Sequence, residues 1–201
     1  MSFHPLMDYG PGHHLSARTM AEEGPAFAFT PEHRAKLEEI CGRYPAEQRR
    51  SAVLAALHLV QRQQGWVSRN AIKAVAEVIR ITTAEVEDVV SYYTMFYTKP
   101  VGKQVIQVCR TLSCALHGAE RVTEEIEKVL GIHVGETTAD GQFTLVEVEC
   151  LGACDRAPVV GVNDDWHEHQ QPDAVKTMLE GLRARGAAAL TGCHLHKERV
   201  S

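Results

Sequence analysis

The sequence predicts an α/β protein in which an N-terminal helical bundle precedes a small sheet with helices packed on it. Between residues 30 and 97, apolar residues recur at helical spacing in four successive stretches. After Pro100-Val101-Gly102 the pattern changes to short runs rich in β-branched residues, which is typical of strands. The expected order beyond that break is strand, helix, strand, strand, helix, and this order favours helices packed on a sheet.

Local signals place the individual elements. The first helix is expected after Thr30, because a threonine N-cap followed by Pro31 marks a helix start. A later helix opens at Thr82, where Glu85 completes a capping box. The remaining helices are expected over about 46–64, 69–79 and 115–130 and from Pro172 onward, and the strands over 104–110, 143–150 and 158–162.

These elements divide the chain into four parts. We expect a flexible N-terminal arm (1–29), a helical domain (30–97), an α/β domain (100–185) and a flexible tail (186–201).

The composition is that of a globular protein with reduced cysteines. Of the 201 residues, 44% are apolar and 23% charged, and the net charge of −5 comes with no basic run that would suit nucleic acid. No stretch approaches the roughly 18 apolar residues of a membrane span, and the N-terminus lacks the layout of a secretory signal. We therefore expect a cytoplasmic protein without direct membrane insertion, in a compartment where disulfides are rare.

Four of the six cysteines form two close pairs, each placed after an expected strand. Cys109 and Cys114 follow the strand QVIQVC, and Cys150 and Cys154 follow FTLVEVEC. Loops at the same end of neighbouring strands can converge, so the four thiolates can meet at one point. The isolated Cys41 lies on an apolar helical face and is expected to be buried.

Several kinds of chemistry are compatible with four cysteines. Structural zinc sites also use four thiolates, but usually in closer C-x2-C pairs, and a redox-active dithiol is more typically C-x-x-C. The wider C-x4-C and C-x3-C spacings favour a 2Fe–2S cluster in which each pair holds one iron. Gly152, between the second pair, allows main-chain N–H groups to approach the sulfurs. Arg110, Arg156 and a helix expected to begin just past Cys114 are candidates to offset the negative charge.

The residues around these cysteines resemble a known family. CRTLSC followed by LHGA, and GETTADGQFTLVEVECLGACDRAPVVGVNDDW, resemble the NuoE-type thioredoxin-like 2Fe–2S subunit of NADH:quinone oxidoreductase, respiratory complex I. The helical segments LHLVQRQQGWVS and VEDVVSYYTMF are similar to that family's N-terminal region. The resemblance covers roughly residues 30–185.

The resemblance implies a fold, a cofactor and partners. It implies a thioredoxin-like domain over about 100–185, and one 2Fe–2S cluster bound by Cys109 and Cys114 on one iron and by Cys150 and Cys154 on the other. It implies an electron-transfer role within an oxidoreductase, beside a subunit that binds FMN and oxidises NADH, together with further iron–sulfur subunits. Such a subunit is peripheral on the cytoplasmic side of the inner membrane, held there through its partners.

Other assemblies use an equivalent subunit. The alternative is the equivalent small 2Fe–2S subunit of a soluble NAD-dependent formate dehydrogenase or of an NAD-reducing hydrogenase. Two further alternatives are a free ferredoxin and a zinc-stabilised interaction module. The chain contains no G-x-G-x-x-G after a strand and no P-loop, so the nucleotide site is expected on a partner. For Cys193, His194 and His196 in the tail we expect only adventitious metal binding.

Overall fold

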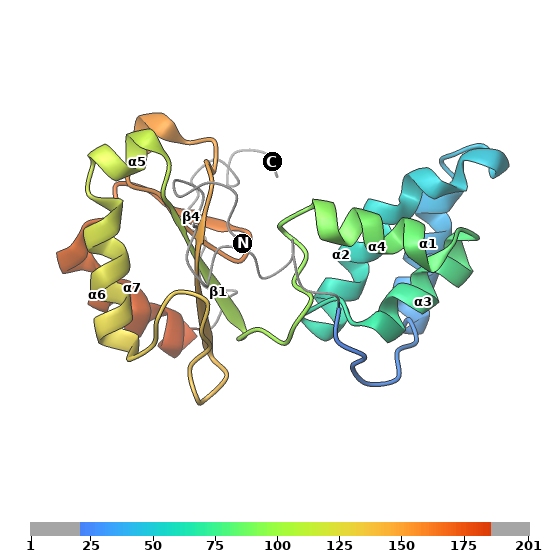
Figure 1. The fold of residues 1–201 in the computed structure, drawn as a ribbon, viewed down its shortest axis with the longest axis horizontal. Coiled ribbons are helices and arrows are strands. Elements are labelled where there is room, and N and C mark those ends of the chain that lie inside the picture. Colours follow the sequence, from blue (N-terminus) through green and yellow to red (C-terminus); the bar gives the residue numbers. More distant parts are fainter. Residues whose placement is uncertain (1–20, 186–201) are drawn as a thin grey trace, which may run out of the picture. The chain divides into compact units, whose positions relative to one another are not determined.

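The structure, a computed structural model, describes residues 21–185, so the tail and residues 1–20 of the arm lie outside the described residues. Its contacts form two compact units, one ending at Pro100 and the other beginning at Val101. Each unit has its own buried apolar core. Figure 1 shows α1 to α4 in the first unit and the sheet with α5 to α7 in the second.

The first unit is helical. It contains α1 (Pro31–Cys41), the 3-10 segment η1 (Ala46–Ala52), α2 (Val53–Gln64), α3 (Arg69–Ile79) and α4 (Thr83–Tyr92). Helix α2 packs against α1, α3 and α4. The core side chains at 1% exposure or less include Leu37, Leu57, Ile72, Val75 and Phe96. Cys41 is 3% exposed in the same core, as its apolar helical face predicts.

The predicted capping signals start two of these helices. Thr30 Oγ1 accepts a hydrogen bond of 3.2 Å from the His33 N–H at the start of α1. At α4, Thr82 Oγ1 accepts from the Glu85 N–H at 3.2 Å, while the Glu85 carboxylate accepts from the Thr82 N–H at 2.9 Å. Both caps satisfy N–H groups that would otherwise have no partner at a helix start.

The prediction of a single helix over 46–64 is wrong for residues 46–52. Residues Ala46–Ala52 form a 3-10 segment in which Gln48 leaves helical geometry. No side chain caps the segment after Pro45. Arg49 instead donates to the Glu38 carboxylate at 2.6 Å and to the Val78 carbonyl oxygen at 3.1 Å. These tertiary contacts hold the 3-10 segment in place.

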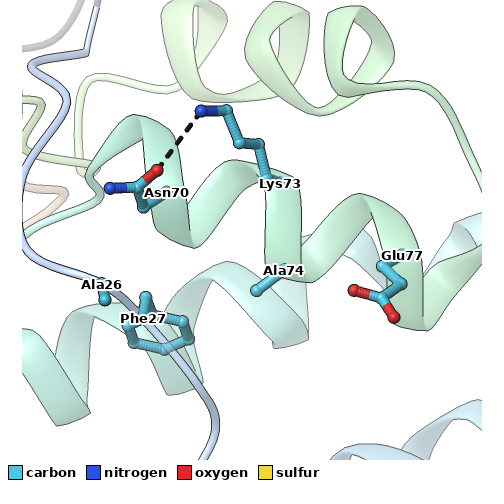
Figure 2. Close-up of a pocket in the computed structure, with 6 residues that line it drawn as sticks. All are labelled: Ala26, Phe27, Asn70, Lys73, Ala74 and Glu77. Atoms are coloured by element: carbon cyan, nitrogen blue, oxygen red, sulfur yellow. Dashed lines mark hydrogen bonds between the residues drawn. The ribbon is translucent and has the colours of Figure 1, made fainter.

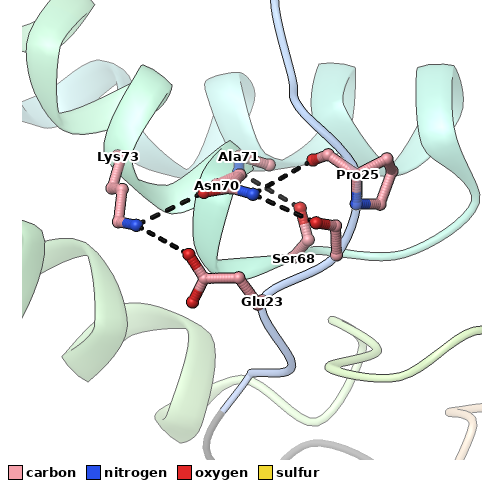
Figure 3. Close-up of polar contacts among 7 residues, drawn as sticks. Glu23, Pro25, Ser68, Asn70, Ala71 and Lys73 are labelled. Carbon is pink, nitrogen blue, oxygen red and sulfur yellow. Dashed lines mark hydrogen bonds and ion pairs between the residues drawn. The ribbon is translucent and has the colours of Figure 1, made fainter.

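Residues 21–29 differ from the flexible arm that the sequence predicted. Asn70 Nδ2 donates to the Gly24 carbonyl oxygen at 3.1 Å, and Lys73 Nζ pairs with the Glu23 carboxylate at 3.0 Å (Figure 3). Phe27 and Phe29 pack against the helical core. These contacts lie far apart in sequence, so local turn residues gave no indication of them.

An open pocket of about 310 Å³ lies between this segment and α3. It is lined by Ala26, Phe27, Asn70, Lys73, Ala74 and Glu77 (Figure 2). The Lys73 ammonium already contacts Glu23 and Asn70, and no cysteine lines the pocket. The pocket is therefore separate from the cysteine chemistry that the sequence indicates.

The second unit is built on a four-stranded sheet. Its strands are β1 (Gln104–Cys109), β2 (Phe143–Val148), β3 (Val160–Val162) and β4 (Asp165–His167), in the order β2-β1-β3-β4. β1 and β2 are parallel, with Gln104 opposite Phe143 and Cys109 opposite Val148. β3 is antiparallel to β1 and β4 is antiparallel to β3. Because β1 and β2 are parallel neighbours, their C-terminal ends reach the same edge of the sheet.

Helices cover this sheet. They are α5 (Leu112–Leu116), α6 (Ala119–Leu130) and α7 (Pro172–Arg185), and a short 3-10 turn, η2 (Cys154–Arg156), precedes the cis peptide bond Ala157–Pro158. α6 packs against both β1 and α7, and Figure 1 shows the two helices on the same side of the sheet. The buried side chains between these layers include Ile106, Val122, Ile126, Leu145 and Leu179.

One predicted helix is divided in two, and one strand was not predicted. The helix expected over 115–130 is two helices, because Gly118 takes a left-handed conformation with φ of 90° between α5 and α6. Cys114 therefore lies inside α5 instead of preceding the helix. The short strand β4 was not predicted, and its pairing with β3 places it in the sheet.

None of the helices within residues 21–185 combines the length and hydrophobicity needed to span a lipid bilayer.

Candidate metal centre

The four paired cysteines are positioned by the edge where β1 and β2 end. Cys109 is the last residue of β1, and Cys150 follows the end of β2 by two residues. Cys114 lies in α5, and Cys154 begins η2. The parallel pairing of the two strands therefore delivers both cysteine loops to one edge, as the sequence predicted.

Contacts join the cysteines within and between the pairs. Cys150 Sγ lies 3.3 Å from Cys154 Sγ, and Cys109 and Cys114 are near enough for each thiol to shift the pKa of the other. Charge on Cys154 raises the pKa of Cys114, charge on Cys109 raises the pKa of Cys154, and Ser113 of α5 contacts the Cys154 main chain, so the two pairs are neighbours.

The two pairs differ in exposure. Cys109 and Cys114 are each 2% exposed, whereas Cys150 and Cys154 are exposed. One side of the site is thus buried in the core of the α/β unit, and the other side meets solvent.

Each pair contains one more acidic and one less acidic thiol. Burial raises the pKa of Cys109, but hydrogen bonds from Thr111 and from the Leu151 N–H outweigh it and hold that pKa below its usual value. Burial raises the pKa of the Cys114 thiol to about 11, and the neighbouring Cys109 adds to the rise. In the exposed pair, the Gly152 N–H lowers the pKa of Cys150, and the adjacent Cys150 raises the pKa of Cys154. In each pair, the environment therefore shifts the pKa values of the two thiols in opposite directions.

Several hydrogen-bond donors point at the sulfurs. The Gly152 N–H lies 3.3 Å from Cys150 Sγ, and Gly152 reaches this position with a left-handed φ of 84°. The main-chain groups of Leu151 and Val159 lower the pKa values of Cys109 and Cys114, respectively. Main-chain donors of this kind are a general feature of cysteine-bound iron–sulfur clusters. Two thiols on each side and donors around them fit a cluster with two metal centres.

The two arginines that the sequence singled out are engaged by carboxylates. Arg110 Nη1 lies 3.8 Å from Glu147 Oε2, and Arg156 Nη1 lies 2.7 Å from Glu168 Oε2. Their guanidinium charges are thus partly neutralised by acidic neighbours, so each offsets less of the charge at the site than a free arginine would.

Two hydroxyl groups near the cysteines were not identified from the sequence. Thr111 Oγ1 lies 3.2 Å from Cys109 Sγ, and Ser113 Oγ donates to the Cys154 carbonyl oxygen at 2.8 Å. Both residues belong to the segment between the first two cysteines, and that position is the only sequence signal for them.

Among the described residues, no three His, Cys, Asp or Glu side chains surround one point as the ligands of a single ion would. Cys193, His194 and His196 lie outside the described residues.

The fold and the site define a protein of the α/β class that presents paired cysteines at one edge of its sheet. The family whose sequence profile matches residues 37–183 is the thioredoxin-like [2Fe-2S] ferredoxin family. The chain belongs to this family, and the resemblance found in the sequence is confirmed.

Named relatives match over most of their length. A protein of Pseudomonas aeruginosa, named as a subunit of NADH-quinone oxidoreductase, is 43% identical over 154 residues, which cover 77% of this chain and 92% of that protein. The mitochondrial NADH dehydrogenase [ubiquinone] flavoprotein 2 of Dictyostelium discoideum is 40% identical over 171 residues, which cover 85% of this chain and 69% of that protein.

A solved structure shares the fold. An air-oxidised NAD+-reducing [NiFe]-hydrogenase chain superposes with a TM-score of 0.60 at 19% identity, over 68% of this chain. The match covers 23% of the hydrogenase chain, so this chain spans less than a quarter of that neighbour. At this identity the likeness is one of fold.

Proposed function

We propose that this chain is the electron-transfer subunit of an NADH:quinone oxidoreductase, respiratory complex I, and holds one 2Fe–2S cluster. The observation that carries the proposal is the meeting of two cysteine pairs at the shared end of β1 and β2. The family match and the relatives named as NADH-quinone oxidoreductase and NADH dehydrogenase proteins support the assignment.

The proposed ligands are the four paired cysteines. Cys109 and Cys114 would hold one iron and Cys150 and Cys154 the other, because each pair brings two sulfurs together. Thiolates are the usual protein ligands of such clusters. The chemistry that a bound 2Fe–2S cluster supplies is the uptake and release of one electron.

The surrounding residues are suited to stabilising negative charge. Two ferric ions, two sulfides and four thiolates carry a formal charge of about −2, and reduction adds one more negative charge. The Gly152 N–H is directed to Cys150 Sγ and would stabilise that charge, as would the main-chain groups of Leu151 and Val159, which lower the pKa values of Cys109 and Cys114. The exposed sulfurs of Cys150 and Cys154 leave one side of the site open to an electron partner.

Oxidation of NADH belongs to a partner in this proposal. The chain carries neither nucleotide-binding motif, so a subunit that binds FMN would oxidise NADH, and further iron–sulfur subunits would complete the assembly. We place the chain peripherally on the cytoplasmic side of the inner membrane, attached through these partners.

We also propose the domain organisation read from the sequence. The helical stretch 30–97 would form a bundle that docks on partner subunits, and residues 100–185 would form the domain that carries the cluster. The separate cores of the two compact units support this division.

The ligand assignment is tested by single substitutions in the full-length chain. Changing Cys109, Cys114, Cys150 or Cys154 to Ala removes one ligand in each case, so we expect loss of iron, of acid-labile sulfide and of the EPR signal of the reduced protein. Cys41→Ala is the matched control, because Cys41 is buried in the helical core, and it should keep the cluster. A normal signal after any of the four substitutions would remove that residue from the ligand set.

The choice of complex is tested by isolating the tagged full-length chain from its own cells. A complex I subunit should co-purify with FMN, with NADH:quinone oxidoreductase activity and with membrane subunits. Recovery with a soluble hydrogenase or formate dehydrogenase would instead establish the alternative assembly.

A further inference from the structure

The Thr111 hydroxyl lies beside the buried cysteine pair. Its Oγ1 is 3.2 Å from Cys109 Sγ. In the exposed pair, the Gly152 N–H is the main cause that lowers the pKa of Cys150, and the Thr111 hydroxyl contributes to the same lowering. This half-buried side chain therefore contacts the Cys109 sulfur, and its hydroxyl also acts electrostatically on the exposed pair.

Thr111 stands at the start of a helix, but its side chain does not cap that helix. Thr111 is the N-cap residue of α5, and threonine at this position usually accepts a hydrogen bond from a main-chain N–H of the first helical turn. The Thr111 side chain makes no such bond. Its hydroxyl is directed to the Cys109 sulfur instead.

The direction of the hydrogen bond follows from the ligand chemistry. A cysteine bound to iron is a thiolate, which has no proton to donate, so the hydroxyl must donate and the sulfur must accept. Reduction adds negative charge to the cluster and its ligands, and a hydrogen bond to a more negative acceptor is stronger. A donor at the sulfur therefore stabilises the reduced state more than the oxidised state and raises the reduction potential.

We propose that Thr111 is a positioning residue that raises the reduction potential of the cluster by donating a hydrogen bond from its hydroxyl to the Cys109 sulfur. This inference rests on the proposed function, because it requires a cluster on the four cysteines. It concerns one side chain and does not depend on which complex contains the chain.

The test compares Thr111→Val, which keeps the branched shape and removes the hydroxyl, with Thr111→Ser, which keeps the hydroxyl. Both are made in the full-length chain, and the midpoint potential is measured by redox titration followed by EPR and visible absorption. Thr111→Val should lower the reduced-to-oxidised ratio at a fixed potential about tenfold, a shift of about 59 mV for a one-electron couple. Thr111→Ser should stay near the wild-type potential. Thr83→Val, at an exposed threonine of α4, is the matched control and should show no shift.

The outcomes separate this inference from the proposed function. If the wild-type chain binds no iron and no acid-labile sulfide, the proposed function fails. If the wild-type chain holds the cluster and Thr111→Val has the same potential, only the role of Thr111 is overturned. Should Thr111→Val and Thr111→Ala both lose the cluster while Thr111→Ser keeps it, the hydroxyl serves assembly, and that result also overturns a role in setting the potential.

Discussion

Ser113 Oγ donates a hydrogen bond of 2.8 Å to the main-chain carbonyl oxygen of Cys154. The two residues are 41 positions apart, and the bond joins α5 to the turn η2. Because α5 contains Cys114 and η2 begins at Cys154, this single contact links the loops that carry the two cysteine pairs.

Ser113→Ala should loosen the site without unfolding the domain. The substitution removes a hydrogen bond worth about 1 kcal/mol, so we expect release of the cluster to a chelator about fivefold faster, followed as bleaching of visible absorption. Ser91→Ala is the matched control, because Ser91 Oγ donates to the Asp88 carbonyl oxygen at 3.0 Å on α4. Equal release rates for the wild type and Ser113→Ala would show that the contact does not hold the loops together.

Gly152→Ala should disturb the loop of the exposed pair. Gly152 has φ of 84°, and a residue with a Cβ is strained there by about 1–2 kcal/mol, although the space around the site is open. The strain should displace the N–H that donates to Cys150 Sγ, so we expect a lower midpoint potential and a cluster that is lost at lower temperature. Gly42→Ala is the control, because Gly42 has an ordinary helical φ of −66°. An unchanged EPR spectrum and an unchanged potential for Gly152→Ala would contradict the proposed role of this N–H.

His167 should make the fold sensitive to acid. Burial lowers the pKa of His167 below its usual value, and its Nε2 is buried without a hydrogen-bond partner in the described structure. The unfolded chain therefore takes up a proton near pH 6.5 that the folded chain accepts only at lower pH, so stability is lost as the pH falls from above about 6.5 toward the folded-state pKa.

The measurement is the unfolding temperature at about pH 7.5 and at about pH 6, followed by circular dichroism. His167→Gln should show a smaller fall between the two pH values than the wild type. The same change at His133, whose side chain is 83% exposed, removes a histidine from the surface and should keep the wild-type difference. A fall for His167→Gln as large as that of the wild type would mean that another group causes the acid sensitivity.

The convergence of Cys109 and Cys150 on one edge was predictable because each cysteine follows an expected strand. QVIQVC and FTLVEVEC each end in a cysteine, and parallel strands bring such ends to one edge. The helix starts at Thr30 and Thr82 were predictable for a similar reason, since a capping residue acts on N–H groups two or three positions away.

Features that depend on distant contacts were not predictable. Residues 21–29 looked like an arm because their partners on α3 lie more than 40 positions later in the chain. β4 has a mixed composition, and its pairing with β3 defines it as a strand. The helix predicted over 115–130 divides at Gly118, so Cys114 lies inside α5, and Ser113 of the same helix contacts Cys154. The spacing of apolar residues indicates neither the division nor the contact.

The most direct test of the account is the iron and acid-labile sulfide content of the purified full-length chain, with EPR of the reduced protein. Two cysteine pairs that share one site predict about two irons and about two sulfides per chain, and a signal from a one-electron-reduced 2Fe–2S cluster. A colourless protein that holds a single zinc ion, or a chain that contains no sulfide, would contradict the central claim.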